Sequence, residues 1–181
     1  MNKFIKLPLF LGLTCLVAGG LLAGVVALTD PVIESAKLER LSKAFRVMYD
    51  DESALSTAQA ELSKEFIDDN KILSINKVTH SGVLSYVYQC KSKSAYEEMQ
   101  FYVGIDYAKK EVDSFYALES NENSLGYGNF SNNDSVTELY SGYQGKGDKI
   151  IANTTITSKA VQEAINRAYA DFLTRSAQWG E

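Results

Sequence analysis

Thr155-Ile-Thr-Ser-Lys-Ala-Val161 predicts a threonine-rich turn that runs into a long amphipathic helix near the end of the chain, and this helix decides the fold. Apolar side chains recur there at spacings of three and four, and charged side chains take the opposite face. Such a stripe buries one face of a helix against a sheet. The apolar stripe comprises Ala160, Val161, Ala164, Ile165, Ala168, Tyr169, Phe172 and Leu173, and the charged face comprises Lys159, Glu163, Arg167 and Arg175.

The residues before this helix predict the sheet on which it packs. The strand patterns are Lys77–Thr79, Val83–Gln89, Phe101–Asp106 and Val112–Leu118, with turns at His80–Gly82 and Tyr107–Lys110. A loop is expected over 121–134, because Asn, Ser and Gly are frequent there. A short helix over 135–143 and a short strand near 149–151 are expected next. The sequence thus predicts an α+β domain with an antiparallel sheet and packed helices over 71–181.

The other end of the chain predicts a membrane anchor over 1–29. No charged residue occurs from Leu7 to Leu28, a run of 22 residues that spans roughly 33 Å as a helix. Lys3 and Lys6 precede it, which favours a cytoplasmic N-terminus and a main domain on the external side. A cleaved signal peptide is the competing interpretation. The length of the run and the lack of a clear cleavage site favour an uncleaved, single-pass anchor.

A helical segment is expected between the anchor and the domain, over 30–70. Asp30-Pro31 reads as a helix start, with Asp as N-cap and Pro in the first turn. The spacing of Leu38, Leu41, Phe45 and Met48 then predicts one apolar face on a helix that ends near Tyr49. A second, weaker helix is expected over 55–66.

Composition limits the possible partners. The chain has 18 basic and 23 acidic residues, and without the cytoplasmic Lys3 and Lys6 the external part has a net charge of −7. Such an acidic domain is a poor candidate for binding nucleic acid. Cys90 is the only cysteine outside the apolar run, so the domain has no internal disulfide.

Catalytic residues are not evident in the sequence. His80 is the only histidine, and a turn residue is its favoured interpretation because no matching partner is recognisable. Cysteine and histidine do not occur at metal-binding spacing. The Thr155 segment is different, because a helix N-terminus offers unpaired N–H groups and a positive dipole end to a phosphate. Plain helix capping is the alternative for these hydroxyls. By elimination, any chemistry is expected to belong to a bound cofactor.

Four stretches of the chain resemble the FMN-binding subunit family that includes the G subunit of Rnf-type electron transport complexes and the C subunit of sodium-translocating NADH:quinone reductase. The anchor runs into Leu28-Thr-Asp-Pro-Val-Ile33 as in that family, and Phe101–Asp106 is similar to its strand before the hairpin. Glu122-Asn-Ser-Leu-Gly126 is similar to its Glu-Thr-Pro-Gly-Leu-Gly loop, without the proline and one glycine. Ala152–Val161 resembles the segment in which the family's threonine is esterified to the phosphate of FMN.

The resemblance implies cofactor-binding residues at particular positions. The modified hydroxyl falls on Thr155, Thr157 and Ser158 lie beside the phosphate, and Asp148 matches the acidic residue ahead of the threonine. Glu122, Leu125 and Gly126 belong to the second motif. Asn153-Thr154 stands where the family has Gly-Ala, and Asp148 lies seven rather than six positions before Thr155, so Thr154 is the alternative attachment residue.

The resemblance also implies a function. The chain is expected to be a membrane-anchored flavoprotein subunit with covalent FMN that relays electrons in an ion-translocating oxidoreductase complex, rather than a stand-alone enzyme. Its expected partners are other membrane subunits of that complex and a flavin transferase that attaches FMN from FAD. The alternative is a flavin-free structural or binding subunit of the same fold. An unrelated anchored solute-binding or pilin-like domain explains the anchor but not the Thr155 segment.

Overall fold

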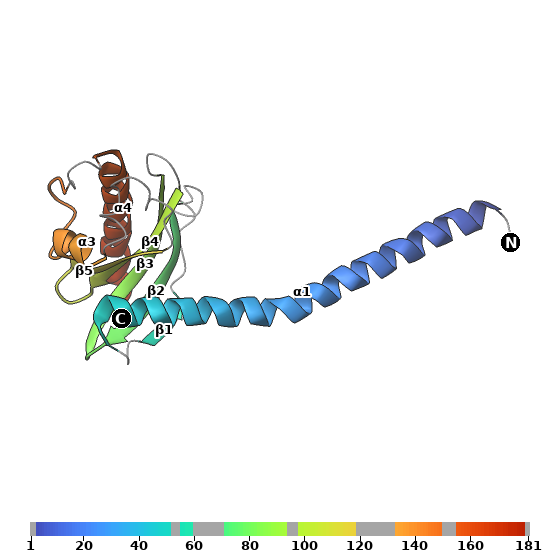
Figure 1. The fold of residues 1–181 in the computed structure, drawn as a ribbon, viewed down its shortest axis with the longest axis horizontal. Coiled ribbons are helices and arrows are strands. Elements are labelled where there is room, and N and C mark those ends of the chain that lie inside the picture. Colours follow the sequence, from blue (N-terminus) through green and yellow to red (C-terminus); the bar gives the residue numbers. More distant parts are fainter. Residues whose placement is uncertain are drawn as a thin grey trace. The chain divides into compact units, whose positions relative to one another are not determined.

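The computed structural model describes residues 3–51, 55–59, 71–93, 98–118, 133–149 and 155–179. It divides into two compact units, Met1–Leu41 and Ser42–Glu181. The first unit is helical, and the second contains the sheet and its helices (Figure 1).

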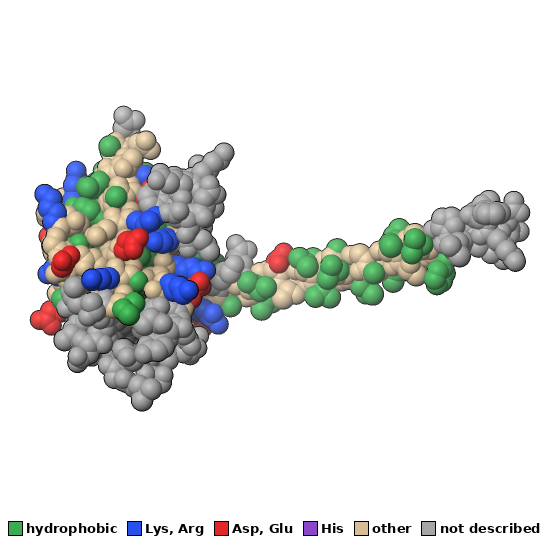
Figure 2. Space-filling view, turned by 90° about the horizontal axis from the view of Figure 1, so that it is seen from above, with side chains coloured by type: hydrophobic (Ala, Val, Ile, Leu, Met, Phe, Trp, Pro, Cys, Tyr) green, Lys and Arg blue, Asp and Glu red, His purple; other side chains and the backbone are tan. Residues whose placement is uncertain are grey.

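Helix α1 runs from Lys3 to Tyr49. Its large apolar side chains between Phe10 and Ile33 are exposed, as Figure 2 shows in green. Among the described residues, α1 is the one helix long and apolar enough to cross a membrane. The expected helix start at Asp30-Pro31 was wrong, because α1 continues through this position. A proline removes one helical hydrogen bond, and the helix-forming residues on both sides maintain the helix here.

The end of α1 belongs to the second unit and ends where the sequence predicted. Phe45 and Ala44 are buried, and Asp50 follows the helix with a positive φ of 46°. Phe45 packs edge-on against Tyr102, with ring centroids 5.8 Å apart. Leu38, which the spacing placed on the same apolar face, is 60% exposed.

The sheet is an antiparallel meander of five strands in the order β1-β2-β3-β4-β5, which confirms the predicted antiparallel sheet (Figure 1). The strands are β1 (Leu55–Gln59), β2 (Ile72–His80), β3 (Val83–Lys93), β4 (Glu98–Asp106) and β5 (Glu111–Ala117). The second helix expected over 55–66 is wrong over 55–59, where the chain adds β1 to the edge of the sheet and pairs its backbone groups with β2. Residues 60–66 lie outside the described part of the chain.

Two tight hairpins set the register of the central strands. Ser81 and Gly82 both have positive φ, 46° and 79°, as a two-residue turn between β2 and β3 requires. Asp106 accepts hydrogen bonds from the backbone N–H groups of Ala108 and Lys109 and closes the turn into β5. The predicted hairpin at 107–110 is therefore confirmed. His80, expected in the first turn, is instead the last residue of β2.

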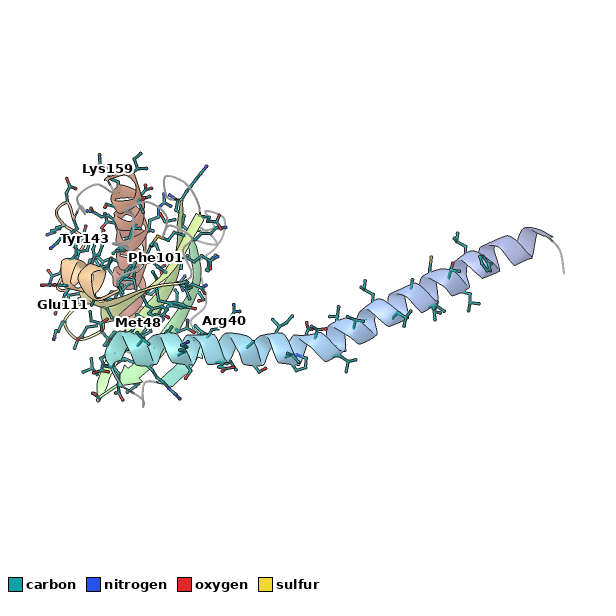
Figure 3. All side chains as sticks on the ribbon, in the orientation of Figure 1. Arg40, Met48, Phe101, Glu111, Tyr143 and Lys159 are labelled. Atoms are coloured by element: carbon teal, nitrogen blue, oxygen red, sulfur yellow. The ribbon has the colours of Figure 1, made fainter. Side chains whose placement is uncertain are left out.

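Two helices pack on one face of the sheet. Helix α4 (Thr155–Trp179) lies against β3 and β4, and the short helix α3 (Asn133–Tyr140) lies against β5. The core between them includes Tyr88, Phe101, Phe115, Tyr140, Ile165 and Phe172, and Figure 3 labels Phe101 within it. The predicted stripe of α4 is confirmed except at Leu173, which is 45% exposed. Lys149 is not in a strand, and 150–151 lie outside the described residues.

The last turns of α1 cover the opposite face of the sheet. Successive side chains of a strand point to opposite faces, so Tyr102 faces away from its neighbours Phe101 and Val103, which join the core under α4. Phe45 of α1 contacts Tyr102 on that second face. This face is buried but rich in polar side chains, among them Ser74, Asn76, Ser85 and Ser114.

Candidate functional site

The first site lies where α4 begins, at Thr155. The sequence predicted a threonine-rich turn that runs into the helix, and in the structure the backbone of Thr155 is already helical. Its first turn contains no acidic residue, so the positive end of the helix dipole is not neutralised there. Thr157 and Ser158 are both buried in this turn, with Thr157 only 2% exposed. The backbone of Thr155 belongs to the helix, while its side chain, like all of Thr154, lies outside the described residues.

The Thr157 hydroxyl is an unusual buried group. No part of the chain that the structure describes forms a hydrogen bond with it. Leaving a buried hydroxyl without a partner costs about 1–3 kcal/mol, so such a group calls for an explanation. A hydroxyl can donate to a phosphate oxygen, and the positive end of a helix dipole favours the same ligand. The residues present therefore fit the phosphate of a bound nucleotide.

A buried polar scaffold holds the segment that leads into α4. The Tyr143 hydroxyl lies 2.7 Å from Asn166 Oδ1 and accepts a hydrogen bond from Gln162 Nε2. The same Gln162 side chain donates to the Gly147 carbonyl and accepts from the Lys149 N–H, at 2.7 and 3.0 Å. Residues 143–149 are thereby fastened to α4, and Figure 3 labels Tyr143 in this segment.

Of the remaining predicted cofactor-binding residues, the structure describes only Asp148 and the backbone of Thr155. Asp148 is exposed, between the two residues that Gln162 binds, and no contact within the described part of the chain joins it to Thr157. Glu122, Leu125 and Gly126 lie outside the described residues. The structure thus brings Thr157 and Ser158 together at the helix start, and the rest of the predicted site stays a prediction.

A groove runs beside α4 near this site. It is lined by Lys71, Lys91, Ser92, Lys93, Glu98, Ala160 and Glu163. Two of its three lysines are already ion-paired, Lys71 with Glu163 at 3.0 Å and Lys91 with Glu98 at 2.8 Å. These pairs neutralise most of the positive charge, so the groove offers only weak attraction to an anion.

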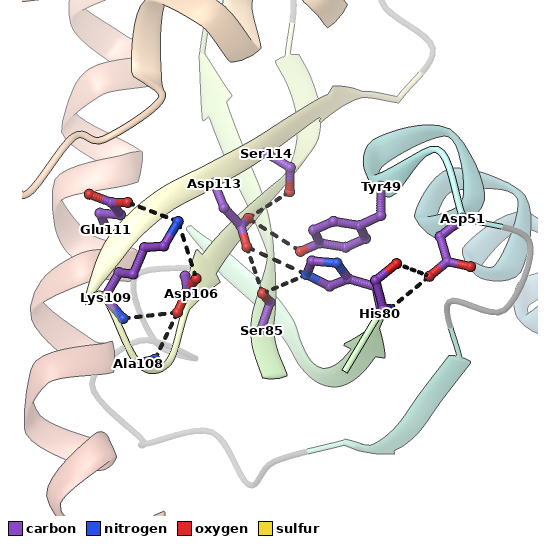
Figure 4. Close-up of polar contacts among 11 residues, drawn as sticks. Tyr49, Asp51, His80, Ser85, Asp106, Ala108, Lys109, Glu111, Asp113 and Ser114 are labelled. Carbon is purple, nitrogen blue, oxygen red and sulfur yellow. Dashed lines mark hydrogen bonds and ion pairs between the residues drawn. The ribbon is translucent and has the colours of Figure 1, made fainter. Parts of the chain in front are cut away.

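Sequence reasoning missed a second polar site, which we call the Asp113 cluster: Tyr49, His80, Ser85, Asp113 and Ser114. Asp113 is the extra residue of a β-bulge, since Ser114 pairs with Gly104 while Val112 pairs with Ile105. A bulge redirects a side chain that would otherwise follow the alternation of the strand. Figure 4 shows the Asp113 carboxylate at the centre of the cluster.

Hydroxyl groups from three elements surround this carboxylate. Ser85 donates to one oxygen at 2.5 Å, and Ser114 and Tyr49 donate to the other at 2.9 and 3.3 Å. His80 Nε2 lies 3.1 Å from Ser85 Oγ and 3.9 Å from the carboxylate. Ser85 thus links the ring of His80 to the carboxylate of Asp113.

This arrangement differs from a hydrolytic triad although it contains the same three residue types. In a triad, histidine lies between serine and aspartate and takes the serine proton. Here Ser85 lies between His80 and Asp113, and its side chain is fully buried. Ser85 therefore presents no nucleophile to a substrate. Among the described residues, no three His, Cys, Asp or Glu side chains lie close enough to hold a metal ion.

One signal in the sequence points to the Asp113 cluster. Gly104 interrupts the apolar run from Phe101 to Ile105, and glycine inside a strand is typical of a bulge or a close approach. A Cβ at this position would collide with Ser114 Oγ, Asp113 Oδ1 and the Tyr49 hydroxyl. The glycine therefore provides the space in which these groups meet.

Neither a scan against protein-family models nor a search of curated proteins finds a match for this chain. The class that the fold itself defines is an α+β protein with an antiparallel sheet. By length and composition, its N-terminal helix is able to span a membrane.

Proposed function

We propose that this chain is a membrane-anchored flavoprotein subunit that carries FMN through a phosphoester on Thr155. The observation that carries the proposal is the buried Thr157 hydroxyl, which has no partner among the described residues and lies in the first turn of α4. The resemblance of Ala152–Val161 to an FMN attachment segment supports the same position.

The residues of this chain would bind and orient the phosphate. The N–H groups at the start of α4 and the Thr157 hydroxyl would donate to its oxygens, and the helix dipole favours its negative charge. Attachment from FAD would exchange the bond between FMN phosphorus and AMP for one to the Thr155 oxygen, so a flavin transferase is the implied partner. The flavin, when bound, supplies reversible electron transfer.

The cellular setting follows from the anchor. We place the domain on the external face of the membrane, because Lys3 and Lys6 precede the apolar run. There the subunit would pass electrons to or from other membrane subunits of an ion-translocating oxidoreductase complex.

In-gel flavin fluorescence of the denatured full-length chain, produced together with a flavin transferase from its own source, tests the proposal. We expect fluorescence that survives denaturation and disappears in Thr155→Ala. Thr154→Ala is the matched control and should keep the signal, whereas the reverse pattern would move the attachment to Thr154. No fluorescence in the wild type, with the transferase active on a known substrate, would reject the flavin and favour the structural subunit.

A further inference from the structure

The turn that leads toward α4 is held by one face of that helix. Gln162, Asn166 and Tyr169 lie on this face, since they are four and three residues apart. Gln162 and Asn166 both contact the Tyr143 hydroxyl, at 3.1 and 2.7 Å. A Cβ on Gly145 would lie 2.9 Å from the ring of Tyr169, so the turn packs directly on the helix there. Three residues of one helix face therefore fix the turn.

Of these three residues, Gln162 lies nearest to the start of α4. Both of its amide N–H groups are used, because Nε2 donates to the Gly147 carbonyl at 2.7 Å and to the Tyr143 hydroxyl. Its Oε1 accepts from the Lys149 N–H at 3.0 Å. The side chain is only 8% exposed, so water competes little for these bonds. Gly147 has a φ of 89°, which glycine adopts without strain.

The same helix face connects this contact to the candidate cofactor site. Ser158, one turn before Gln162, is buried on it. Residues 150–154 join Lys149 to Thr155, the first residue of the helix. The N–H groups of the first helical turn have no partner within the helix, so the position of Thr155 depends also on the chain before it. Gln162 fixes the near end of that connection.

We propose that Gln162 is a positioning residue for the attachment of FMN: by holding Gly147 and Lys149, it sets the approach of the chain to Thr155. Asp148, the acidic residue ahead of the threonine, lies between the two residues that Gln162 binds and is held with them. Gln162 acts through these residues and is not itself a ligand of the phosphate. The inference rests on the proposed function.

The rate of FMN attachment tests this role, measured on the full-length chain in detergent with FAD and a flavin transferase. Gln162→Leu keeps a side chain of similar size but removes the amide, so the turn is released. We expect attachment to be slower by about tenfold or more, because a misplaced reacting group reacts much more slowly.

Tyr88→Phe is the matched control for a general loss of stability. It also leaves a buried polar group without its partner, because Asp171 loses the hydrogen bond from the Tyr88 hydroxyl. Asp171 lies nine residues beyond Gln162 on α4, in the half that does not hold the turn. The attachment rate of Tyr88→Phe should stay within about twofold of the wild type.

Gln162→Glu supplies a signature that a loss of stability does not produce. An ionised glutamate accepts from the Lys149 N–H but has no donor for the Gly147 carbonyl, whereas the protonated acid can donate there. The attachment rate of this variant is divided by the wild-type rate at the same pH, which cancels the pH dependence of the transferase. This ratio should rise as the pH falls toward the glutamate pKa, ordinarily about 4.3 and raised by burial. The corresponding ratio for Gln162→Leu should stay flat.

Hydrogen exchange of the flavin-free chain monitors the turn itself. The Lys149 amide should exchange faster in Gln162→Leu, which lacks its acceptor, and stay protected in Gln162→Glu. The core amides around Phe172 should be unchanged in both variants. If they lose protection in Gln162→Leu, that variant is unfolded, and the pH dependence of Gln162→Glu decides.

The proposal and the proposed function fail in different ways. Attachment at the wild-type rate in Gln162→Leu would overturn the role of Gln162. An equal slowing in Tyr88→Phe, or a ratio for Gln162→Glu that does not change with pH, would also overturn it. If the proposed function is wrong, the wild type itself acquires no flavin while the transferase modifies its known substrate, and the role of Gln162 in attachment is rejected with it.

Discussion

At the scale of single residues, the absence of a side chain matters as much as the presence of one. Gly104 pairs with Ser114 across β4 and β5 and leaves room for three polar groups above it. At the start of α4, Thr157 has the opposite character, since its hydroxyl is buried without a partner in the described chain. A substitution at each of these two positions therefore has an effect that can be measured.

Gly104→Ala should destabilise the domain. The added methyl group collides with Ser114, Asp113 and Tyr49, and such overpacking costs about 1–3 kcal/mol. Urea unfolding of the full-length chain in detergent, followed by tryptophan fluorescence, measures the change. Gly82→Asn is the control, because nothing lies within 4 Å of a Cβ there and asparagine tolerates the positive φ of 79°. Equal stability of Gly104→Ala and the wild type would contradict the close approach of Ser114, Asp113 and Tyr49 to Gly104.

Thr157→Val should have opposite effects on stability and on flavin attachment. The substitution removes a buried hydroxyl without changing the shape, so the flavin-free chain should gain about 1 kcal/mol of unfolding free energy. Attachment of FMN should fall, because the phosphate loses a donor. Urea unfolding and in-gel fluorescence measure the two effects. A loss of stability in the flavin-free chain would mean that the Thr157 hydroxyl is already satisfied.

At the scale of elements, α4 joins the core to the candidate cofactor site. The C-terminal half of α4 packs on the sheet through Phe172. In the same half, the buried Asp171 accepts a hydrogen bond of 3.1 Å from the hydroxyl of Tyr88 on β3. Its N-terminal half is fastened to residues 143–149 by Gln162 and Tyr143. One helix therefore sets both the stability of the domain and the position of Thr157.

Substitutions at two adjacent positions of α4 should distinguish its buried face from its exposed face by their effect on stability. Phe172→Ala removes a fully buried ring and should cost about 3–5 kcal/mol. Leu173→Ala, at the exposed neighbouring position, should change stability by no more than about 0.5 kcal/mol. Urea unfolding of both variants checks the orientation of the helix. Similar losses for the two would show that Leu173 is also covered.

At the scale of the whole molecule, the chain combines a helix long and apolar enough to span a membrane with a unit that has its own buried core. The described side chains of α1 up to Ile33 are exposed and mostly apolar, whereas the second unit buries an aromatic core. The proposed membrane anchor would place this exposed apolar surface in a bilayer.

Cysteine labelling in intact cells should establish the orientation. Ser141 is exposed on the domain, and in a Cys15→Ser background Ser141→Cys should react with a membrane-impermeant maleimide. Lys3→Cys should react only after lysis. Cys90 should stay silent in both, because burial raises the pKa of its thiol. Labelling of Lys3→Cys in intact cells would reverse the proposed orientation.

The sequence by itself determined the parts of this protein that depend on periodic patterns and local turn chemistry. The apolar run of the anchor, the strands around both hairpins, the short helix near 135 and the stripe of α4 are all legible from spacing. The threonine and serine residues also marked the region where α4 begins, although the structure makes Thr155 helical where the sequence predicted a turn. These features depend on neighbours in the chain, and the identity of such neighbours is visible in the sequence.

Only the tertiary structure decided the continuous helix through Pro31, the edge strand β1 and the Asp113 cluster. Tyr49, His80, Ser85 and Asp113 come from four elements, and no spacing in the chain relates them. Asp113 faces the others because the pairing of β4 with β5 slips by one residue at Gly104. The burial that raises the pKa of Asp113 likewise depends on the packing of these elements against one another. Packing between distant segments supplies the low-dielectric surroundings, and local sequence does not encode them.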